Sequence, residues 1–301
     1  MSENHSKNCL VTGASGFIGR QVVQELIRQD WQVTSVSRNT NSDPTYDNLE
    51  NVKLDLHNPA NVAAFFEVYR PTYLVHLAWE ATPGKFWQST ENFPWISSSA
   101  HLIDQFVKNG GVKAVLAGSC AEYKWENKIL HEDTSPTEAD SYYAASKLAF
   151  KSLADVIGRD INIVWARLFF PYGPDEAGSK LISYIFKEIS EDKLPTIQTP
   201  DRAVDFIHVD DVAIIIEKLL SGLASGTVNI CSGTPLLPYE IAIRCAEVLG
   251  KPELKETLSD LLSGLQSKAV VYGSNEKRQA LTGMPSVRSL EHGLQDYVES
   301  N

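Results

Sequence analysis

The stretch Leu10–Gly19, with the sequence LVTGASGFIG, decides the fold of this chain. The apolar run Cys9–Thr12 predicts a buried strand, and the amphipathic residues Phe17–Arg28 predict a helix. A glycine-rich turn from strand to helix suits the pyrophosphate of a dinucleotide, because glycine allows close backbone approach and the helix N-terminus carries partial positive charge. The residues that we assign to the cofactor here are Gly13, Ser15, Gly16, Phe17, Ile18 and Gly19.

The spacing of this loop, G-x-x-G-x-x-G, differs from the commoner dinucleotide pattern G-x-G-x-x-G. The alternative is therefore a tight turn that binds no ligand. Motifs in the rest of the chain are needed to distinguish a dinucleotide site from such a turn.

Short apolar runs alternate with longer amphipathic stretches after the loop. This alternation predicts parallel βαβ units, so we expect an α/β fold with a Rossmann-like, doubly wound parallel sheet. The expected domains are a dinucleotide-binding domain at 1–168, with returning segments at about 206–231, and a smaller interleaved substrate lobe at 169–301. Further strands are expected at 32–37, 52–56, 73–78, 114–117, 161–168 and 227–231, helices at 59–68, 100–107, 141–157, 210–220 and 238–249, and a loop at 170–178.

The composition excludes several classes of protein. The net charge of −11 over 301 residues argues against a nucleic-acid partner, because binding phosphates requires a basic surface. Residues 1–8 lack the apolar core of a signal peptide, and no apolar run is long enough for a membrane span. The four cysteines have no metal-binding spacing, and Cys9 and Cys231 lie in strand-like runs. We expect buried thiols and a cytoplasmic protein.

The end of the second predicted strand indicates which cofactor binds. An acidic residue there accepts a hydrogen bond from the ribose of NAD, whereas an arginine pairs with the 2′-phosphate of NADP. The chain has Ser37, Arg38 and Asn39 at this point, which predicts NADP, with NAD as the alternative cofactor. A solvated arginine without a ligand is the competing interpretation. Further cofactor contacts are expected from Asp55, Leu56, Leu77, Ala78 and Trp79, at the ends of the third and fourth strands.

The predicted helix at 141–157 carries Tyr143 and Lys147 four residues apart, and hence on one face. A free tyrosine has a pKa of about 10, and a neighbouring ammonium group is expected to lower this pKa so that the phenol can exchange protons. Lys147 can also hydrogen-bond the cofactor ribose, whereas Tyr142 lies on a different face. Ser119 follows the strand at 114–117 and so reaches the same sheet edge, where its hydroxyl can orient a carbonyl. A solvated Tyr-Lys pair and a turn serine are the alternatives.

Together, these motifs resemble the extended short-chain dehydrogenase/reductase family of nucleotide-sugar epimerases, dehydratases and ketoreductases. The resemblance implies that Ser119, Tyr143 and Lys147 form the catalytic triad, that the C-terminal lobe binds a nucleotide-linked sugar, and that Phe170 lies at the nicotinamide end. It also implies a homodimer, as many family members form. The resemblance rests on TGASGFIG at 12–19, VHLA at 75–78, Ser119 four residues before Tyr123, YAASK at 143–147, RLFFPYGP at 167–174, DFIHVDDVA at 205–213 and SLEHGL at 289–294.

Departures from the family pattern narrow the implied chemistry. The 4,6-dehydratases carry an Asp-Glu pair after the hydroxyl residue, where this chain has Cys120 and Ala121. The bifunctional epimerase-reductases have a cysteine where this chain has Ala121. We therefore predict an NADP(H)-dependent oxidoreductase that reduces a keto group of a nucleoside diphosphate sugar, with C4 as the candidate carbon and Tyr143 as the proton donor. The alternatives are a nucleotide-sugar epimerase with tightly bound NAD and a non-enzymatic NADP-binding sensor or scaffold.

The substrate side departs further from the pattern. Phe170 stands where many members have an asparagine that contacts the sugar diphosphate, and Val204 stands where an arginine usually precedes Asp-Phe. The residues that we assign to the substrate are Glu122, Lys180 and Arg202.

One further cluster superficially suggests a metal. His208, Asp210 and Asp211 lie close together in the sequence. We expect no metal there, because the stretch is typical of a helix start with an aspartate at the N-cap.

Overall fold

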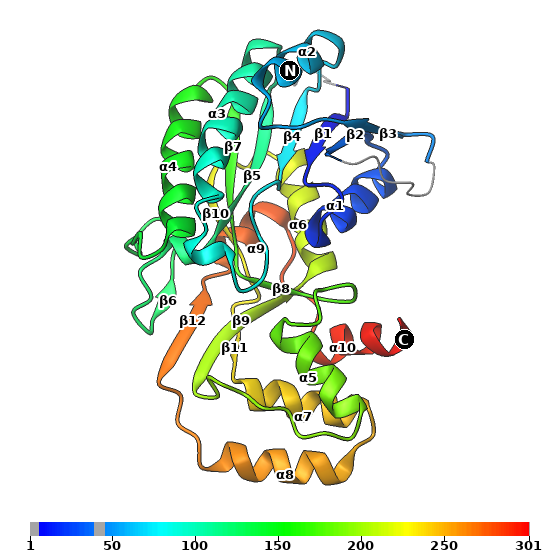
Figure 1. Ribbon diagram of the computed structural model, residues 1–301, viewed down its shortest axis with the longest axis vertical. Coiled ribbons are helices and arrows are strands. Elements are labelled where there is room, and N and C mark those ends of the chain that lie inside the picture. The colour runs from blue at the N-terminus through cyan, green and yellow to red at the C-terminus, as the bar shows by residue number, and fades with distance from the viewer. Residues whose placement is uncertain (1–5, 39–45, 301) are drawn as a thin grey trace. The chain divides into compact units, whose positions relative to one another are not determined.

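The computed structural model describes residues 6–38 and 46–300, which divide into two units (Figure 1). The first unit comprises residues 1–124, 136–168 and 213–228. The second comprises residues 125–135, 169–212 and 229–301.

The first unit is built on a seven-stranded sheet with the order β10-β7-β5-β4-β1-β2-β3. The pairs β1–β2, β1–β4, β2–β3, β4–β5 and β5–β7 are parallel. This order confirms the predicted Rossmann-like fold. From β1 the chain continues through β2 and β3 toward one edge of the sheet, and from β4 it continues through β5 and β7 toward the other edge. Doubly wound sheets bind their ligands at such a switch point, which here lies between β1 and β4. The strands are β1 (Asn8–Thr12), β2 (Gln32–Ser37), β3 (Leu49–Lys53), β4 (Tyr73–His76), β5 (Lys113–Ser119), β7 (Asn162–Leu168) and β10 (Gly226–Ile230).

Helices cover this sheet because its central strands are apolar on both faces, as in other parallel sheets. Aromatic residues of three helices, including Phe66, Phe106 and Phe150, form one buried cluster with strand residues such as Leu74 and Trp165. Figure 1 shows two of these helices, α3 and α4, running side by side along the sheet. The helices are α1 (Phe17–Arg28), α2 (Pro59–Val68), α3 (Asn92–Lys108), α4 (Tyr142–Ile157) and α6 (Val209–Ser221).

Two predicted elements of this unit need correction. The third strand is Leu49–Lys53, not 52–56, because its register with β2 pairs Val33 with Leu49. It is an edge strand with a half-exposed pattern, so the buried Leu54 and Leu56 just beyond it misled the prediction. Helix α3 begins at Asn92 and not at residue 100.

The second unit contains a smaller sheet with the order β11-β9-β12-β6, in which β8 also pairs with β9. Its helices share an apolar cluster that includes Ile185, Ile241 and Leu294. The expected loop at 170–178 therefore begins as a strand. The elements are β6 (Ile129–Leu130), β8 (Phe170–Tyr172), α5 (Leu181–Ser190), β9 (Arg202–His208), β11 (Pro235–Leu236), α7 (Pro238–Val248), α8 (Pro252–Ser263), β12 (Ala269–Gly273), α9 (Glu276–Thr282) and α10 (Leu290–Glu299).

The segment 125–135 belongs to the second unit, although the predicted domain boundary at residue 168 placed it in the first. The physical reason is that β6 pairs with β12. The assignment of the two domains to cofactor and substrate stays a prediction. Among the described residues, no helix has the length and apolar character needed to cross a membrane.

Candidate active site

The glycine loop lies where β1 passes into α1. Gly13 has a φ of +68°, and a side chain there would come within 2.7 Å of the backbone nitrogen of Ala78, after β4. A side chain at Gly19 would overlap the carbonyl oxygen of Gly13. Helix α1 has no side-chain cap and no acidic residue in its first turn. The loop is therefore a close-packed backbone cradle that leaves a helix N-terminus for an anion.

A buried hydrogen-bond network ties this cradle to β4 and α3. The Thr12 hydroxyl lies 2.7 Å from His76 Nδ1 and accepts from the backbone N–H of Ala78 at 3.3 Å. His76 Nε2 lies 2.8 Å from the Ser99 hydroxyl. Burial, together with the charge of Lys147, lowers the pKa of His76 to about 3, so this histidine is a neutral structural link.

The end of β2, where the sequence predicts that NADP is distinguished from NAD, is exposed to solvent at Arg38. Ser37 ends β2, and Arg38 follows it with an exposed side chain. Asn39 lies outside the described residues. Asp55 is exposed, and its carboxylate accepts from the backbone N–H of His57 at 3.0 Å, whereas Leu56 is buried.

The three residues predicted to form the catalytic triad lie in the first unit, at the end of β5 and on the first turns of α4. The Ser119 hydroxyl lowers the pKa of the neighbouring Tyr143 phenol, and it accepts a hydrogen bond from the backbone N–H of Ala121 at 3.2 Å. Ser141 caps α4 by accepting from the backbone N–H of Ala144 at 3.2 Å. This cap fixes the start of the helix and hence the direction of Tyr143.

Lys147 is nearly buried beside this pair, with 3% of its surface exposed. Its ammonium group donates to the carbonyl oxygen of Ala117 at 2.8 Å and lies 3.8 Å from the centroid of the Trp79 ring. Burial lowers the pKa of Lys147 to about 7, and the charge of Glu122 acts in the opposite direction. Cation–π contact with Trp79 is a second source of stabilisation for the charged form.

The pKa of Tyr143 differs from the expectation. Burial raises it well above the ordinary value, the hydrogen bond from Ser119 lowers it, and Glu122 and Cys120 add to the rise. The expected lowering by Lys147 is therefore wrong for this structure. A raised pKa keeps the phenol protonated over the neutral range, which suits a proton donor.

Aromatic side chains of the segment after β4 surround Tyr143. The Phe86 ring lies edge-on to it with centroids 4.8 Å apart, and the Trp87 ring lies at 5.9 Å. Trp79 stacks on Phe150 and donates from its indole N–H to the Asn92 side chain at 2.8 Å. Sequence reasoning missed Phe86 and Trp87, because no motif points to a short helical turn between β4 and α3. These rings limit the access of water to the phenol.

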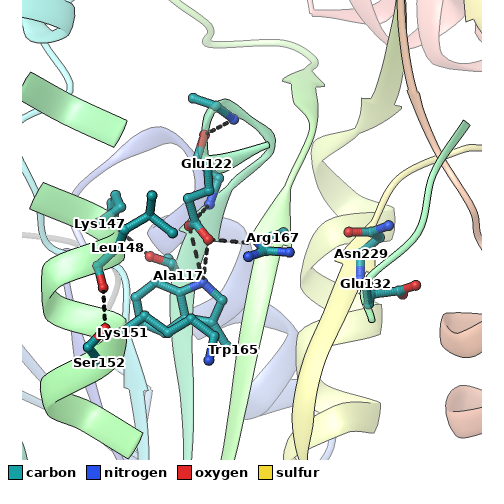
Figure 2. Close-up of polar contacts among 12 residues, drawn as sticks. Ala117, Glu122, Glu132, Lys147, Leu148, Lys151, Ser152, Trp165, Arg167 and Asn229 are labelled. Atoms are coloured by element: carbon teal, nitrogen blue, oxygen red, sulfur yellow. Dashed lines mark hydrogen bonds and ion pairs between the residues drawn. The ribbon is translucent and has the colours of Figure 1, made fainter. Parts of the chain in front are cut away.

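Glu122 has no exposed surface, so its side chain is not accessible to a substrate. This differs from the prediction that Glu122 is a substrate-binding residue. Its carboxylate accepts from the backbone N–H of Ser119 at 2.7 Å, from the Trp165 indole at 2.9 Å and from Arg167 Nε at 2.8 Å. In Figure 2, dashed lines join this carboxylate to the Trp165 and Arg167 side chains of β7, and Lys147 of α4 lies on the side away from Arg167.

The remaining predicted residues lie in the second unit. Phe170 is in β8, where its ring lies 5.8 Å from that of Phe206 in β9. Lys180 is the exposed residue before α5, and Arg202 begins β9 with its guanidinium 5.9 Å from the Trp125 ring. Their contacts with cofactor and substrate stay predictions.

Histidine and carboxylate groups do gather in the second unit, where His208, Asp210 and Asp296 bring ligand atoms within 4.8 Å of one another. Arg288, however, is ion-paired to both aspartates, at 3.2 Å from Asp210. The positive charge at this cluster is therefore supplied by the protein. Helix α6 begins at Val209, so Asp210 lies in its first turn and not at the expected N-cap.

All four cysteines are free and buried, as predicted for Cys9 and Cys231. Cys120 is buried as well, with 4% of its surface exposed.

Comparison with known proteins gives a family match and several relatives. The model of the NAD dependent epimerase/dehydratase family matches residues 9–231. The chain is 27% identical over 316 aligned positions to the UDP-glucuronate 4-epimerase of Thermodesulfobacterium geofontis (strain OPF15), with 96% of this chain and 94% of that protein covered. It is 24% identical to the dTDP-6-deoxy-L-talose 4-dehydrogenase (NAD(+)) of Aggregatibacter actinomycetemcomitans, over 76% of this chain and 85% of that protein.

The fold also matches solved structures. MoeE5 in complex with UDP-glucose and NAD superposes with a TM-score of 0.78 at 24% identity, covering 97% of this chain and 98% of that chain. At this identity the match demonstrates a shared fold.

Proposed function

Since the chain belongs to the NAD dependent epimerase/dehydratase family, we propose that it is an NADP(H)-dependent oxidoreductase acting on the C4 keto group of a nucleoside diphosphate sugar. The observation that carries this proposal is the grouping of the Ser119 hydroxyl with the Tyr143 phenol, with the ammonium group of Lys147 5.8 Å from the centroid of the Tyr143 ring. The 4-dehydrogenase and 4-epimerase relatives support redox chemistry at C4.

The glycine loop fits a nicotinamide dinucleotide. The cradle at Gly13 and Gly19 has no room for side chains, so only backbone lines it there, and backbone N–H groups are the donors that a pyrophosphate needs. When bound, the cofactor supplies or accepts the hydride. Lys147 and Trp79 lie at the end of this site that is next to Tyr143, where they would hold the ribose and the ring.

The residues of the chain supply the proton and the orientation. In the reductive direction, the Ser119 hydroxyl donates a hydrogen bond to the carbonyl oxygen of the sugar, and Tyr143 transfers its phenolic proton to that oxygen. The raised pKa of Tyr143 ensures that the proton is present before the reaction.

Preference for NADP rests on Arg38. A guanidinium at the end of β2 can bind a 2′-phosphate with two parallel hydrogen bonds, and its exposed side chain is free to turn toward that phosphate. Lys180 and Arg202 are the cations that we propose for the sugar diphosphate, with Phe170 at the nicotinamide end.

A second candidate is a 4-epimerase that retains NAD and returns the hydride to the sugar. The UDP-glucuronate 4-epimerase favours it, because the similarity extends over 96% of this chain. The two candidates differ in what becomes of the cofactor. Denaturing the purified protein would release stoichiometric oxidised NAD from an epimerase, whereas a reductase consumes added NADPH in proportion to product.

The experiment is a turnover assay with NADPH or NADH and a panel of nucleoside diphosphate 4-keto sugars. We expect loss of NADPH absorbance that depends on the sugar and is absent in Tyr143→Phe. Interconversion of 4-epimers without added cofactor would establish the epimerase instead. If neither reaction occurs and NADPH changes only the oligomeric state, the chain is a sensor or scaffold.

A homodimer in the cytoplasm is part of the same proposal. Exposed apolar side chains on α3 and α4, such as Phe93, Leu153 and Val156, support an interface between copies of the chain. Sedimentation of the purified protein tests it.

A further inference from the structure

We propose that Glu122 is a positioning residue of this active site: its buried carboxylate holds Ser119 in place and provides a negative charge that favours the protonated form of Lys147. This inference rests on the proposed function for its kinetic consequences, but not for its structural ones.

Glu122 fixes the position of Ser119 through the turn that follows β5. Ser119 is the last residue of β5, and its backbone N–H donates to Glu122 at 2.7 Å, while its hydroxyl accepts from the N–H of Ala121. These two bonds close a capping box that locks the short turn after the strand. The direction of the Ser119 hydroxyl toward Tyr143 therefore depends on the carboxylate beneath it.

The Glu122 carboxylate is itself held by donors from β7. Trp165 and Arg167, both from β7 and both nearly buried, each donate to it, at 2.9 and 2.8 Å. Arg167 is itself held over the Tyr123 ring, 4.1 Å from the centroid. Three donors therefore hold this side chain in one orientation, and Figure 2 shows the two that come from β7.

The negative charge of Glu122 acts on the ammonium group of Lys147. The groups that face Lys147 are the carboxylate of Glu122, the phenol of Tyr143, the imidazole of His76 and the Trp79 ring. His76 is neutral and the phenol of Tyr143 is protonated at neutral pH. Among these, Glu122 is the anion, so it is the group that opposes the effect of burial on the ammonium.

The matched variants have to separate charge from folding. Glu122→Gln alone would turn an amide N–H toward the donors of Trp165 and Arg167 and could unfold the turn. We therefore compare Trp165→Phe, which removes one donor and keeps the carboxylate, with the double variant Glu122→Gln/Trp165→Phe. Glu122→Asp is the third variant, because it keeps the charge but shortens the side chain.

The readout that needs no substrate is the titration of Lys147. Protein labelled with [ε-13C]lysine gives one signal that is missing in Lys147→Met, and its chemical shift reports protonation. We expect a midpoint close to that of the wild type in Trp165→Phe. In the double variant, the midpoint should move down by on the order of one pH unit. An unchanged midpoint in the double variant would overturn the charge role, whether or not the sugar substrate is turned over.

The kinetic readout tests the positioning role. In Glu122→Asp we expect kcat to fall by about tenfold with KM for NADPH unchanged and with the same pH limb, since the charge remains but the bond to the Ser119 N–H is lost. Wild-type kcat in Glu122→Asp would overturn this part. Absence of turnover in the wild type contradicts the proposed function instead, and the lysine titration then still tests Glu122.

Discussion

The two ends of the proposed cofactor site are built in opposite ways. At the triad end, Lys147 and Glu122 are almost or wholly buried, and each is held by bonds to other parts of the first unit. At the other end, Arg38 is exposed at the close of an edge-proximal strand. The groups of the triad end are thus held by burial and hydrogen bonding, whereas the preference for NADP that we propose depends on a side chain that solvent screens.

The two ends should therefore respond differently to substitution. A charge in a dry environment interacts strongly with its neighbours, and an exposed charge interacts weakly. Substitutions at the triad end should therefore alter rate and pH dependence, and substitutions at the Arg38 end should alter affinity by modest factors. The glycine loop joins the two ends, so damage there should affect both.

The largest effect is expected for Gly19→Ala. Its methyl group would overlap the carbonyl oxygen of Gly13, so the loop must open, at a cost of about 1–3 kcal/mol in the free energy of unfolding. We expect NADPH affinity to fall by about a hundredfold, measured by fluorescence titration. Gly264→Ala is the matched control, because the same methyl group would meet no heavy atom within 4 Å and the φ of Gly264 is −92°. Equal losses in both variants would contradict the cradle.

The next effect concerns Lys147 and pH. Because burial places its pKa at about 7, the ammonium group loses its proton as the pH rises through that value. If the charged form supports catalysis, kcat/KM should decline above about pH 7. Lys147→Met should lower kcat/KM at neutral pH by about a hundredfold and abolish this decline. A wild-type pH profile that is flat from pH 6 to 9 would contradict the assignment, and so would one that rises.

A smaller effect is expected at the exposed end. Arg38→Ala should weaken NADPH binding by about tenfold and leave NADH binding unchanged, because a solvent-screened charge-assisted hydrogen bond is lost. Isothermal titration with both cofactors measures this selectivity. No preference for NADPH in the wild type would remove the case for NADP, leaving NAD as the cofactor.

The first unit could be predicted closely from the sequence. Helices at Phe17–Arg28 and Pro59–Val68 and the strand Gln32–Ser37 have their predicted bounds, because strong turn signals flank a clear periodicity. The second unit could be predicted only in part, with its helix Pro238–Val248 close to the predicted 238–249. Its strands β9 and β12 were not predicted, because they pair with partners far away in the chain and their burial depends on that pairing.

The candidate site shows the same division. Ser119, Tyr143 and Lys147 are recognisable from spacing, since one helix face and one strand end bring them together. The role of Glu122 could not be predicted, because it depends on donors from β7, more than forty residues away in sequence. For the same reason the direction of the Tyr143 pKa shift was predicted wrongly: burial raises this pKa, and burial is a property of the folded chain.

The most direct test of the proposed function is kcat at saturating NADPH for Tyr143→Phe, with the affinity for NADPH measured on the same sample. The phenol donates the proton but does not line the glycine cradle. We therefore predict that kcat falls by about 10²–10⁴ while the dissociation constant for NADPH stays within about twofold of the wild type. Retention of wild-type turnover by Tyr143→Phe would contradict the assignment of Tyr143 as the proton donor.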